Sequence, residues 1–172
     1  MFNKIAAALS LILASSAAFA AQPNTFYGGV DAGRTKLDGF AKRDTSVGAF
    51  AGYNFHQNFA VEAGYRRLAD QDYSLAMGSY VFHESAKVDQ AHLSVVGSLP
   101  VSEKFSVYGR LGVNRLEARI SSPVYSGKDT TTKALYGVGL GYAITEAVSA
   151  RVEVQKPASD LTNVSAGVSF RF

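Results

Sequence analysis

Seven charged residues lie inside largely apolar stretches of the sequence, and their chemistry depends on where those stretches fold. Most have an apolar or small residue on either side, as Glu62 has between Val61 and Ala63. Acids and guanidinium groups that share a water-poor space persist only when they are paired and hydrogen-bonded. Such a set predicts either a static network of ion pairs or a gate in which an acid exchanges basic partners. The seven residues are Asp31, Glu62, Arg66, Arg110, Arg151, Glu153 and Arg171.

Nucleophilic or metal chemistry has much weaker support. Hydrolysis or acyl transfer by serine needs a histidine base, and of the three histidines only His92 lies near a serine in an alternating segment, two positions before Ser94. We expect His92 to be hydrogen-bonded by Gln90 or Asn114 rather than to act as a base. No cluster of acids and histidines has metal-ligand spacing. The sequence therefore predicts no catalytic residue, no cofactor and no metal site.

The composition narrows the class of protein. A length of 172 residues allows one ordinary domain, and charged residues make up 18%, below the roughly 25% of soluble domains. The absence of cysteine excludes a disulfide scaffold and a thiolate metal site. The net charge of +3 is small and its cations are spread along the chain, which argues against a nucleic-acid binder.

The first 20 residues have the pattern of a cleaved secretory signal peptide. Lys4 supplies the positive start, residues 5–13 form an uncharged apolar core, and residues 18–20 read Ala-Phe-Ala, a small-residue cleavage site. The apolar core is shorter than the roughly 20 residues that a spanning helix needs. We predict cleavage after residue 20 and a single domain over residues 21–172.

Eight later segments alternate apolar and polar residues with a period of two, which is typical of β-strands. In each segment, every second residue is apolar, and the positions between are glycine, small, polar or charged. The isolated charged residues belong to this polar set. The segments cover residues 26–32, 47–55, 59–65, 91–99, 105–113, 134–142, 148–154 and 164–172.

Alternation alone fits both a soluble barrel with an apolar interior and a membrane barrel with an apolar exterior. Three features favour the membrane barrel. Short connections at 56–58, 100–104 and 144–146 alternate with longer ones, aromatic residues gather beside the short connections, and the charged set suits a lumen. We therefore predict an all-β fold, an eight-stranded antiparallel transmembrane β-barrel with short periplasmic turns and longer extracellular loops.

The order and spacing of five stretches resemble the OmpA transmembrane-domain family. These are VGAFAGYNF ending at residue 55, AVEAGYRRL at 68, VYGRLG at 112, GVGLGYAITEAVSARVEVQ at 155 and VSAGVSFRF at 172. The resemblance implies a porin-like barrel in the outer membrane of a Gram-negative cell. It also implies delivery by the barrel-assembly machinery, because Phe170 and Phe172 match the family's C-terminal assembly signal.

The same resemblance bears on the charged set. OmpA-like barrels carry an acid on the third strand, matched by Glu62, and a basic partner on the seventh, matched by Arg151, whereas the second acid of the sixth strand is replaced by Gly141. A gate in which Arg151 exchanges between two acids would therefore lack the second acid that the family carries on the sixth strand. Because the sequence stops at Phe172 without a peptidoglycan-binding domain, no cell-wall tethering is expected.

On the side of the long loops, each of four series of alternate apolar residues ends in a cation. The eight residue steps from Phe26 to Arg34 span about 26 Å along a strand, which at a tilt near 40° gives roughly the height of an apolar belt. Arginine binds phosphate bidentately, and the outer leaflet is rich in lipopolysaccharide phosphate. We predict phosphate contacts, or alternatively simple extension of the side chains to the interface, for Arg34, Arg67, Arg115 and Lys156.

An eight-stranded barrel has an interior that side chains just fill, so we expect a structural barrel whose loops face lipopolysaccharide or an extracellular protein or glycan. A narrow gated ion-conducting pore is the alternative function, and a lipid A-modifying enzyme is the least favoured. We expect no nucleic-acid partner. The predicted loops mix aromatic and basic residues, namely Lys42, Arg43, Tyr73, Tyr80, Phe82, Tyr125 and Lys128.

Overall fold

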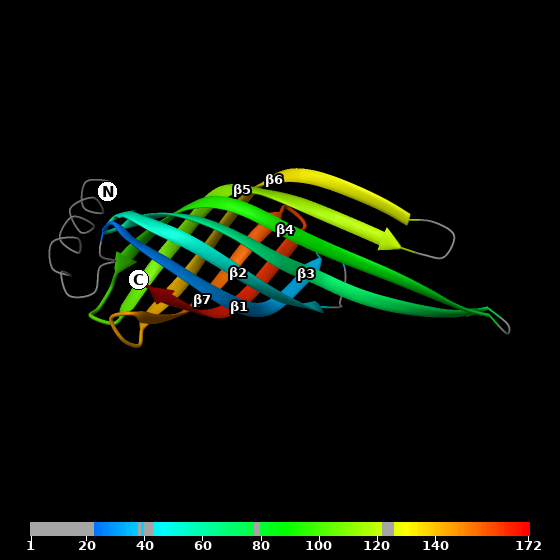
Figure 1. Ribbon diagram of the computed structural model, residues 1–172, viewed down its shortest axis with the longest axis horizontal. Coiled ribbons are helices and arrows are strands. Elements are labelled where there is room, and N and C mark those ends of the chain that lie inside the picture. Colours follow the sequence, from blue (N-terminus) through cyan, green and yellow to red (C-terminus); the bar gives the residue numbers. More distant parts are fainter. Residues whose placement is uncertain (1–22, 38, 40–42, 78–79, 122–125) are drawn as a thin grey trace.

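The computed structural model describes residues 23–37, 39, 43–77, 80–121 and 126–172. Each of its eight strands pairs antiparallel with the next, and β1 pairs with β8 to close a barrel (Figure 1). The eight-stranded antiparallel fold predicted from the alternation is confirmed. The strands are β1 (Thr25–Leu37), β2 (Arg43–His56), β3 (Phe59–Met77), β4 (Tyr80–Pro100), β5 (Phe105–Ser121), β6 (Ser126–Ala143), β7 (Val148–Ala158) and β8 (Leu161–Arg171).

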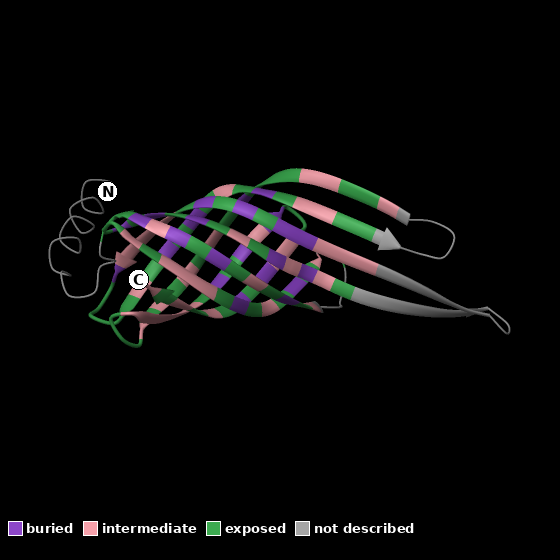
Figure 2. Cartoon of the chain, viewed as in Figure 1, coloured by how far each residue is buried: buried purple, intermediate pink, exposed green. Residues whose placement is uncertain are grey.

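Alternate residues of each strand point outward and into the lumen. On β1, Val30 is 57% exposed while its neighbour Asp31 is 6% exposed, and buried and exposed bands alternate along the strands in Figure 2. The outward set is apolar and the inward set is polar, which is the arrangement of a barrel surrounded by lipid. The most exposed apolar residues of the belt include Leu111, Val138, Leu140, Val30, Leu93 and Val113.

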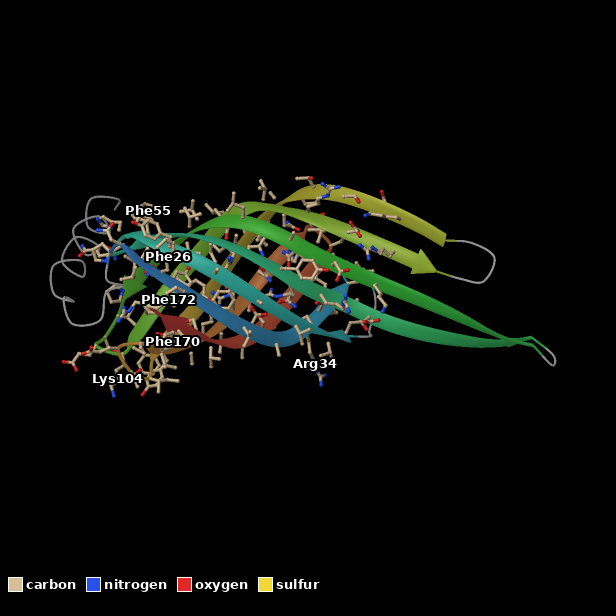
Figure 3. All side chains as sticks on the ribbon, in the orientation of Figure 1. Phe26, Arg34, Phe55, Lys104, Phe170 and Phe172 are labelled. Carbon is tan, nitrogen blue, oxygen red and sulfur yellow. The ribbon has the colours of Figure 1, made fainter. Side chains whose placement is uncertain are left out.

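The last residue of the chain closes the barrel at the end that carries the short turns. The backbone N–H of Phe26 donates to the carbonyl of Phe172 at 3.2 Å, and the N–H of Phe172 donates to the carbonyl of Phe26 at 2.9 Å. Figure 3 shows Phe26, Phe55, Phe170 and Phe172 at this end. Aromatic rings pair around it, as a membrane-interface girdle requires. These pairs are Phe26 with Tyr53, Phe55 with Phe59, Phe105 with Tyr142 and Phe170 with Phe172.

Four strands extend well beyond the closed barrel, so that much of the sequence expected in the long loops is paired strand. Pairing of β2 with β3 ends at Val47 and Arg67, and pairing of β6 with β7 ends at Tyr136 and Lys156. Past these levels β3 to β6 continue as an open four-stranded sheet, visible on the right of Figure 1. We call residues 68–77, 80–89, 116–121 and 126–135 the projecting sheet.

A β-bulge on β3 lies at the base of the projecting sheet. The register of β3 against β4 shifts between Arg67 and Ala69, and the extra residue, Leu68, is fully buried. A bulge inserts one residue and so changes which positions face each side of the strand. Beyond it outward positions are charged, as at Asp70 and Lys87, so the outward apolar series of the barrel wall ends there.

Candidate functional site

Arg110 on β5 lies in the lumen between acids from two other strands. Its Nη2 donates to Oε1 of Glu62 on β3 at 2.7 Å, and its Nε donates to Oε1 of Glu153 on β7 at 2.8 Å. Its Nη1 donates to Oγ of Ser94 on β4 at 2.7 Å. Because the three charged residues are at most 2% exposed, their charges are tolerable only through this pairing.

Arg151 and Arg66 extend the network to β1. Arg151 Nη1 donates to Glu62 Oε2 at 2.8 Å, and its Nη2 lies 3.6 Å from Asp31 Oδ2. Arg66 binds the same aspartate with two hydrogen bonds, of 3.0 Å to Oδ1 and 2.7 Å to Oδ2. The Arg151 guanidinium also stacks 3.3 Å above the centre of the Phe50 ring, a cation–π contact. Three carboxylates thus face three guanidinium groups in one continuous network.

Arg171 is the predicted lumen residue that this network does not include. It lies near the short turns on β8, and its guanidinium donates to the backbone carbonyl of Glu146. Among the described residues none of the three network acids contacts it. The acids are already matched in number by the other guanidinium groups, so Arg171 instead ties the last strand to a turn.

Glycines on the inner wall provide the space for tyrosine rings. A Cβ atom on Gly52 would lie 2.3 Å from Cζ of Tyr27, and one on Gly139 would lie 2.4 Å from Cζ of Tyr108. The two tyrosine hydroxyls donate to network carboxylates at 3.0 Å and 2.8 Å. On β6 the space beside Gly139 is thus filled by the Tyr108 ring.

An amide-centred layer closes the lumen between the network and the projecting sheet. Asn163 is fully buried, and its Oδ1 accepts from Arg66 Nη1 at 2.8 Å. Its Nδ2 donates to Oγ of Ser46 at 2.7 Å and to Oγ1 of Thr35 at 3.0 Å. Sequence reasoning missed this layer because uncharged residues on alternate positions look like any polar face. Their one signal is that they belong to the inward register of β1, β2 and β8.

A cavity of about 170 Å³ opens toward the short turns on the other side of the network. Glu62 and Arg151 form part of its wall, together with Ser106, Gly141 and Arg171. Polar walls of this kind suit ordered water. The lumen therefore has a hollow half that reaches the Glu62–Arg151 pair and a half filled by side chains.

His92 and Ser94 have no catalytic arrangement. His92 Nε2 lies 3.2 Å from Arg110 Nη1 and 3.7 Å from Glu62 Oε1, while Ser94 Oγ donates to the Glu62 carbonyl at 3.3 Å. Neither Gln90 nor Asn114 bonds His92 as predicted: Nδ1 of the histidine, the Gln90 amide and Asn114 Oδ1 are buried without a protein partner. Within the described part of the chain no group of three metal-binding side chains occurs.

The four rim cations occupy the outward register where the closed barrel ends. Arg34 points away from the barrel wall in Figure 3 and, like Arg115, is exposed. Arg67 is engaged by acids, with Asp89 Oδ1 3.1 Å from its Nε and Asp70 Oδ2 3.4 Å from its Nη1. Lys156 Nζ donates to the carbonyl of Ser159 at 3.1 Å.

Several predicted features fall outside what the structure describes. The signal peptide over residues 1–20 lies outside the described residues, as do Lys42 and Tyr125. Of the remaining predicted loop residues, Arg43 begins β2, Tyr73, Tyr80 and Phe82 lie on the strands β3 and β4, and Lys128 lies on β6, where it pairs with Glu117 at 2.8 Å. No helix in the described ranges has the length and hydropathy to cross a membrane.

Two curated proteins of the outer membrane are similar in sequence. Outer membrane protein P5 of Haemophilus influenzae is 31% identical over 94% of this chain and 57% of its own length. Outer membrane protein A of Escherichia coli O157:H7 is 29% identical over 99% of this chain and 55% of its own length. The chain thus spans a little over half the length of these relatives.

Solved structures share the fold at lower identity. Neisserial surface protein A matches with a TM-score of 0.59 and 18% identity over 86% of this chain and 97% of its own. Ail of Yersinia pestis, in complex with the heparin analogue sucrose octasulfate, matches with a TM-score of 0.58 and 19% identity over 88% of this chain and all of its own. A de novo designed transmembrane β-barrel matches with a TM-score of 0.57, so this likeness shows the fold alone.

The family model described as the outer membrane protein beta-barrel domain matches residues 5–172, nearly the whole chain. This match agrees with the closed barrel, its apolar exterior and its aromatic girdle. The chain belongs to the outer membrane protein β-barrel family and is an integral protein of the outer membrane.

Proposed function

We propose that this protein is a sealed anchor in the outer membrane that holds the projecting sheet outside as a contact surface. The observation that carries this proposal is the lumen network, in which Arg110 bridges Glu62 and Glu153 across the barrel with bonds of 2.7 and 2.8 Å. A lumen crossed by buried ion pairs and then by the Asn163 layer supports anchoring rather than transport. Aqueous channels belong to barrels of about 16 strands.

Conductance in a planar bilayer tests the seal. The refolded barrel, confirmed as folded by its heat-dependent mobility on a gel, is expected to remain electrically silent. Discrete openings of the unmodified barrel would contradict the seal. Glu62→Gln keeps the shape of the side chain while removing its charge, and so shows whether any current depends on the network.

One observation favours a narrow gated pore as a second candidate. The cavity on the short-turn side reaches the Glu62–Arg151 pair, and Arg151 has a second acid, Asp31, 3.6 Å away. An exchange of Arg151 between the two acids would loosen the network. For this candidate, openings appear in the unmodified barrel and change in frequency in Glu62→Ala and Arg151→Ala.

The contact surface is tested by shortening it. Hairpins β3–β4 and β5–β6 are cut back to the level of the closed barrel, and adhesion of cells carrying either form is compared on matrix-coated and heparin-coated surfaces. Heparin is included because Ail of Yersinia pestis is known in complex with a heparin analogue. Loss of adhesion with an intact barrel is expected, and unchanged adhesion would contradict a contact role.

Lipopolysaccharide is the proposed partner of the rim. An apolar groove of about 490 Å³ on the outer wall, lined in part by Ala32, Val164 and Ala166, reaches Arg34 and Lys36, and this pairing of apolar wall and cations suits an acyl chain below a phosphate. Arg34→Gln and Arg115→Gln are expected to lower thermal stability in bilayers containing lipopolysaccharide but not in phospholipid alone. Equal stability in both bilayers would contradict the contact. Arg67→Gln provides the comparison. Its effect is expected to be smaller, because Arg67 already pairs with Asp70 and Asp89.

A further inference from the structure

The strand β6 has a free edge in the projecting sheet. Its residues 126–135 pair with β5 on one side, but pairing with β7 stops at Tyr136 and Lys156. The next residue of β7, Pro157, has no N–H to donate, and its carbonyl accepts from Asn114 Nδ2 at 2.9 Å, which turns β7 into the mouth of the lumen. The described strands thus leave the other edge of residues 126–135 without a partner.

The sequence of this edge is complementary to itself. Around Thr131 it reads Lys-Asp-Thr-Thr-Thr-Lys over residues 128–133. If two copies pair antiparallel with Thr131 opposite Thr131, then Asp129 of each lies opposite Lys133 of the other, on the same face of the sheet. Opposite charges placed directly across a strand pair are favourable. The edge therefore offers two ion pairs to a second copy of itself.

The charges involved are available. Asp129 and Lys133 are both exposed, and neither has an ion pair with another described residue; Asp129 Oδ1 only accepts from the Thr130 N–H at 2.9 Å. Lys128, in contrast, forms an ion pair with Glu117 of the same sheet at 2.8 Å. An edge lysine opposes addition of a strand that offers no acid, so this edge selects a partner with an acid at the matching position.

The direction of pairing decides where the second copy lies. Antiparallel pairing reverses the second β6, so the two barrels point in opposite directions and cannot share one membrane. The ten residues of the edge span about 33 Å, which sets the largest distance between the two barrel rims. We infer that the β6 edge joins this protein to a second copy of itself in an apposed membrane. This inference rests on the proposed function of the projecting sheet as a contact surface.

Clustering of phospholipid vesicles that contain the refolded barrel tests the inference, with particle size followed by light scattering. Unmodified vesicles are expected to cluster. Asp129→Lys vesicles carry two lysines at the paired positions and Lys133→Asp vesicles carry two acids, so each kind alone is expected to stay at single-vesicle size. A mixture of the two kinds is expected to cluster again, because each variant then faces its complement.

Two controls make the result decisive. The double variant Asp129→Lys, Lys133→Asp is complementary to itself again and is expected to cluster, which separates a lost contact from a misfolded barrel. Asp160→Lys, in the exposed β7–β8 turn, makes the same change of net charge as Asp129→Lys and is expected to leave clustering intact.

Single unmodified vesicles, or a mixture of the two single variants that stays dispersed, would overturn the inference. If adhesion that depends on the hairpins persists in that case, the contact role of the sheet stands and only the second copy as partner fails. If neither vesicle clustering nor adhesion that depends on the hairpins is observed, the proposed contact role also fails.

Discussion

The closed barrel and the projecting sheet are built from the same strands but have opposite polarity. In the barrel the outward residues are apolar and the lumen holds the ion pairs. In the projecting sheet the outward side carries ion pairs, such as Glu117 with Lys128 at 2.8 Å and Asp70 with Lys87 at 3.5 Å. Its inner register holds apolar residues such as Val88 and Leu116, and on β6 the charged Asp129 and Lys133. The medium outside the strand, lipid or water, decides which face is apolar.

The ion pairs of the two parts also differ in kind. Arg110 makes bonds to two acids, a serine and a neighbouring histidine, all buried. Lys128 and Arg119 bind Glu117 at an exposed site. Removing one partner of a buried pair leaves an uncompensated charge, whereas water replaces a lost partner at the surface. The buried ion pairs of the lumen therefore contribute to stability, whereas the exposed charges of the projecting sheet are free to contact other molecules.

The largest expected effect is at the centre of the lumen. Arg110→Met removes one guanidinium and leaves Glu62 and Glu153 short of a partner, which is expected to lower the free energy of unfolding by about 3–5 kcal/mol. Arg119→Met makes the same change on the projecting sheet and is expected to have little effect. Urea unfolding in phospholipid vesicles, followed by gel mobility, measures both. Equal losses in the two variants would contradict the distinction.

A charged residue introduced on the outer face should lower the free energy of unfolding in the closed barrel but not in the projecting sheet. Val30 lies midway between Phe26 and Arg34 on β1, so Val30→Arg places a cation near the middle of the apolar belt. The expected loss is about 2–4 kcal/mol, measured by the same unfolding experiment. Thr130→Arg on the projecting sheet is the control and is expected to be neutral; a comparable loss there would show that lipid also surrounds the sheet.

Glycines on the two faces of the barrel should tolerate a side chain differently. A Cβ on Gly139 meets the Tyr108 ring at 2.4 Å, whereas one on Gly109, facing outward, has nothing nearer than 4.0 Å. Gly139→Val is expected to destabilise by about 1–3 kcal/mol through overpacking, and Gly109→Val to change stability little. If thermal unfolding in vesicles ranks them in the reverse order, the packed lumen is contradicted.

The smallest expected effect is the pH response of the projecting sheet. The hydrogen bond from Lys128, with the Arg119 guanidinium nearby, holds the pKa of Glu117 below its ordinary value. A depressed pKa means that the pairing stabilises the fold above the pKa of the unfolded chain and is lost as the pH falls through the folded pKa. NMR titration of Glu117 in the unmodified protein and in Lys128→Met checks this. Identical titration in both would contradict the pairing, and added salt should weaken it.

The barrel could be predicted from sequence because one physical pattern covers it. Lipid on one side and a packed lumen on the other force alternation at every position from Phe26 to Ala32 and along the matching strands. The same register placed Glu62, Arg110 and Arg151 in the lumen. Which acid meets which guanidinium could not be predicted, because that depends on the stagger of the strands around the closed barrel.

The projecting sheet could not be predicted because its pattern is interrupted and reversed. The bulge at Leu68 changes which residues of β3 point outward. Beyond the bulge the outward residues face water, whereas within the closed barrel they face lipid. The free edge of β6 could not be predicted either, because Pro157 signals an end of pairing on β7 without showing which neighbouring strand is left exposed.

A spin-label scan along β5 tests most directly whether polarity reverses at the rim. The chain has no cysteine, so single cysteines can be placed from Val107 to Arg119 without further changes. We predict that outward positions up to Val113 are accessible to oxygen dissolved in lipid, and that Glu117 and Arg119 are accessible to a water-soluble nickel reagent. Lipid accessibility that continues through Glu117, or water accessibility at Leu111, would contradict the reversal.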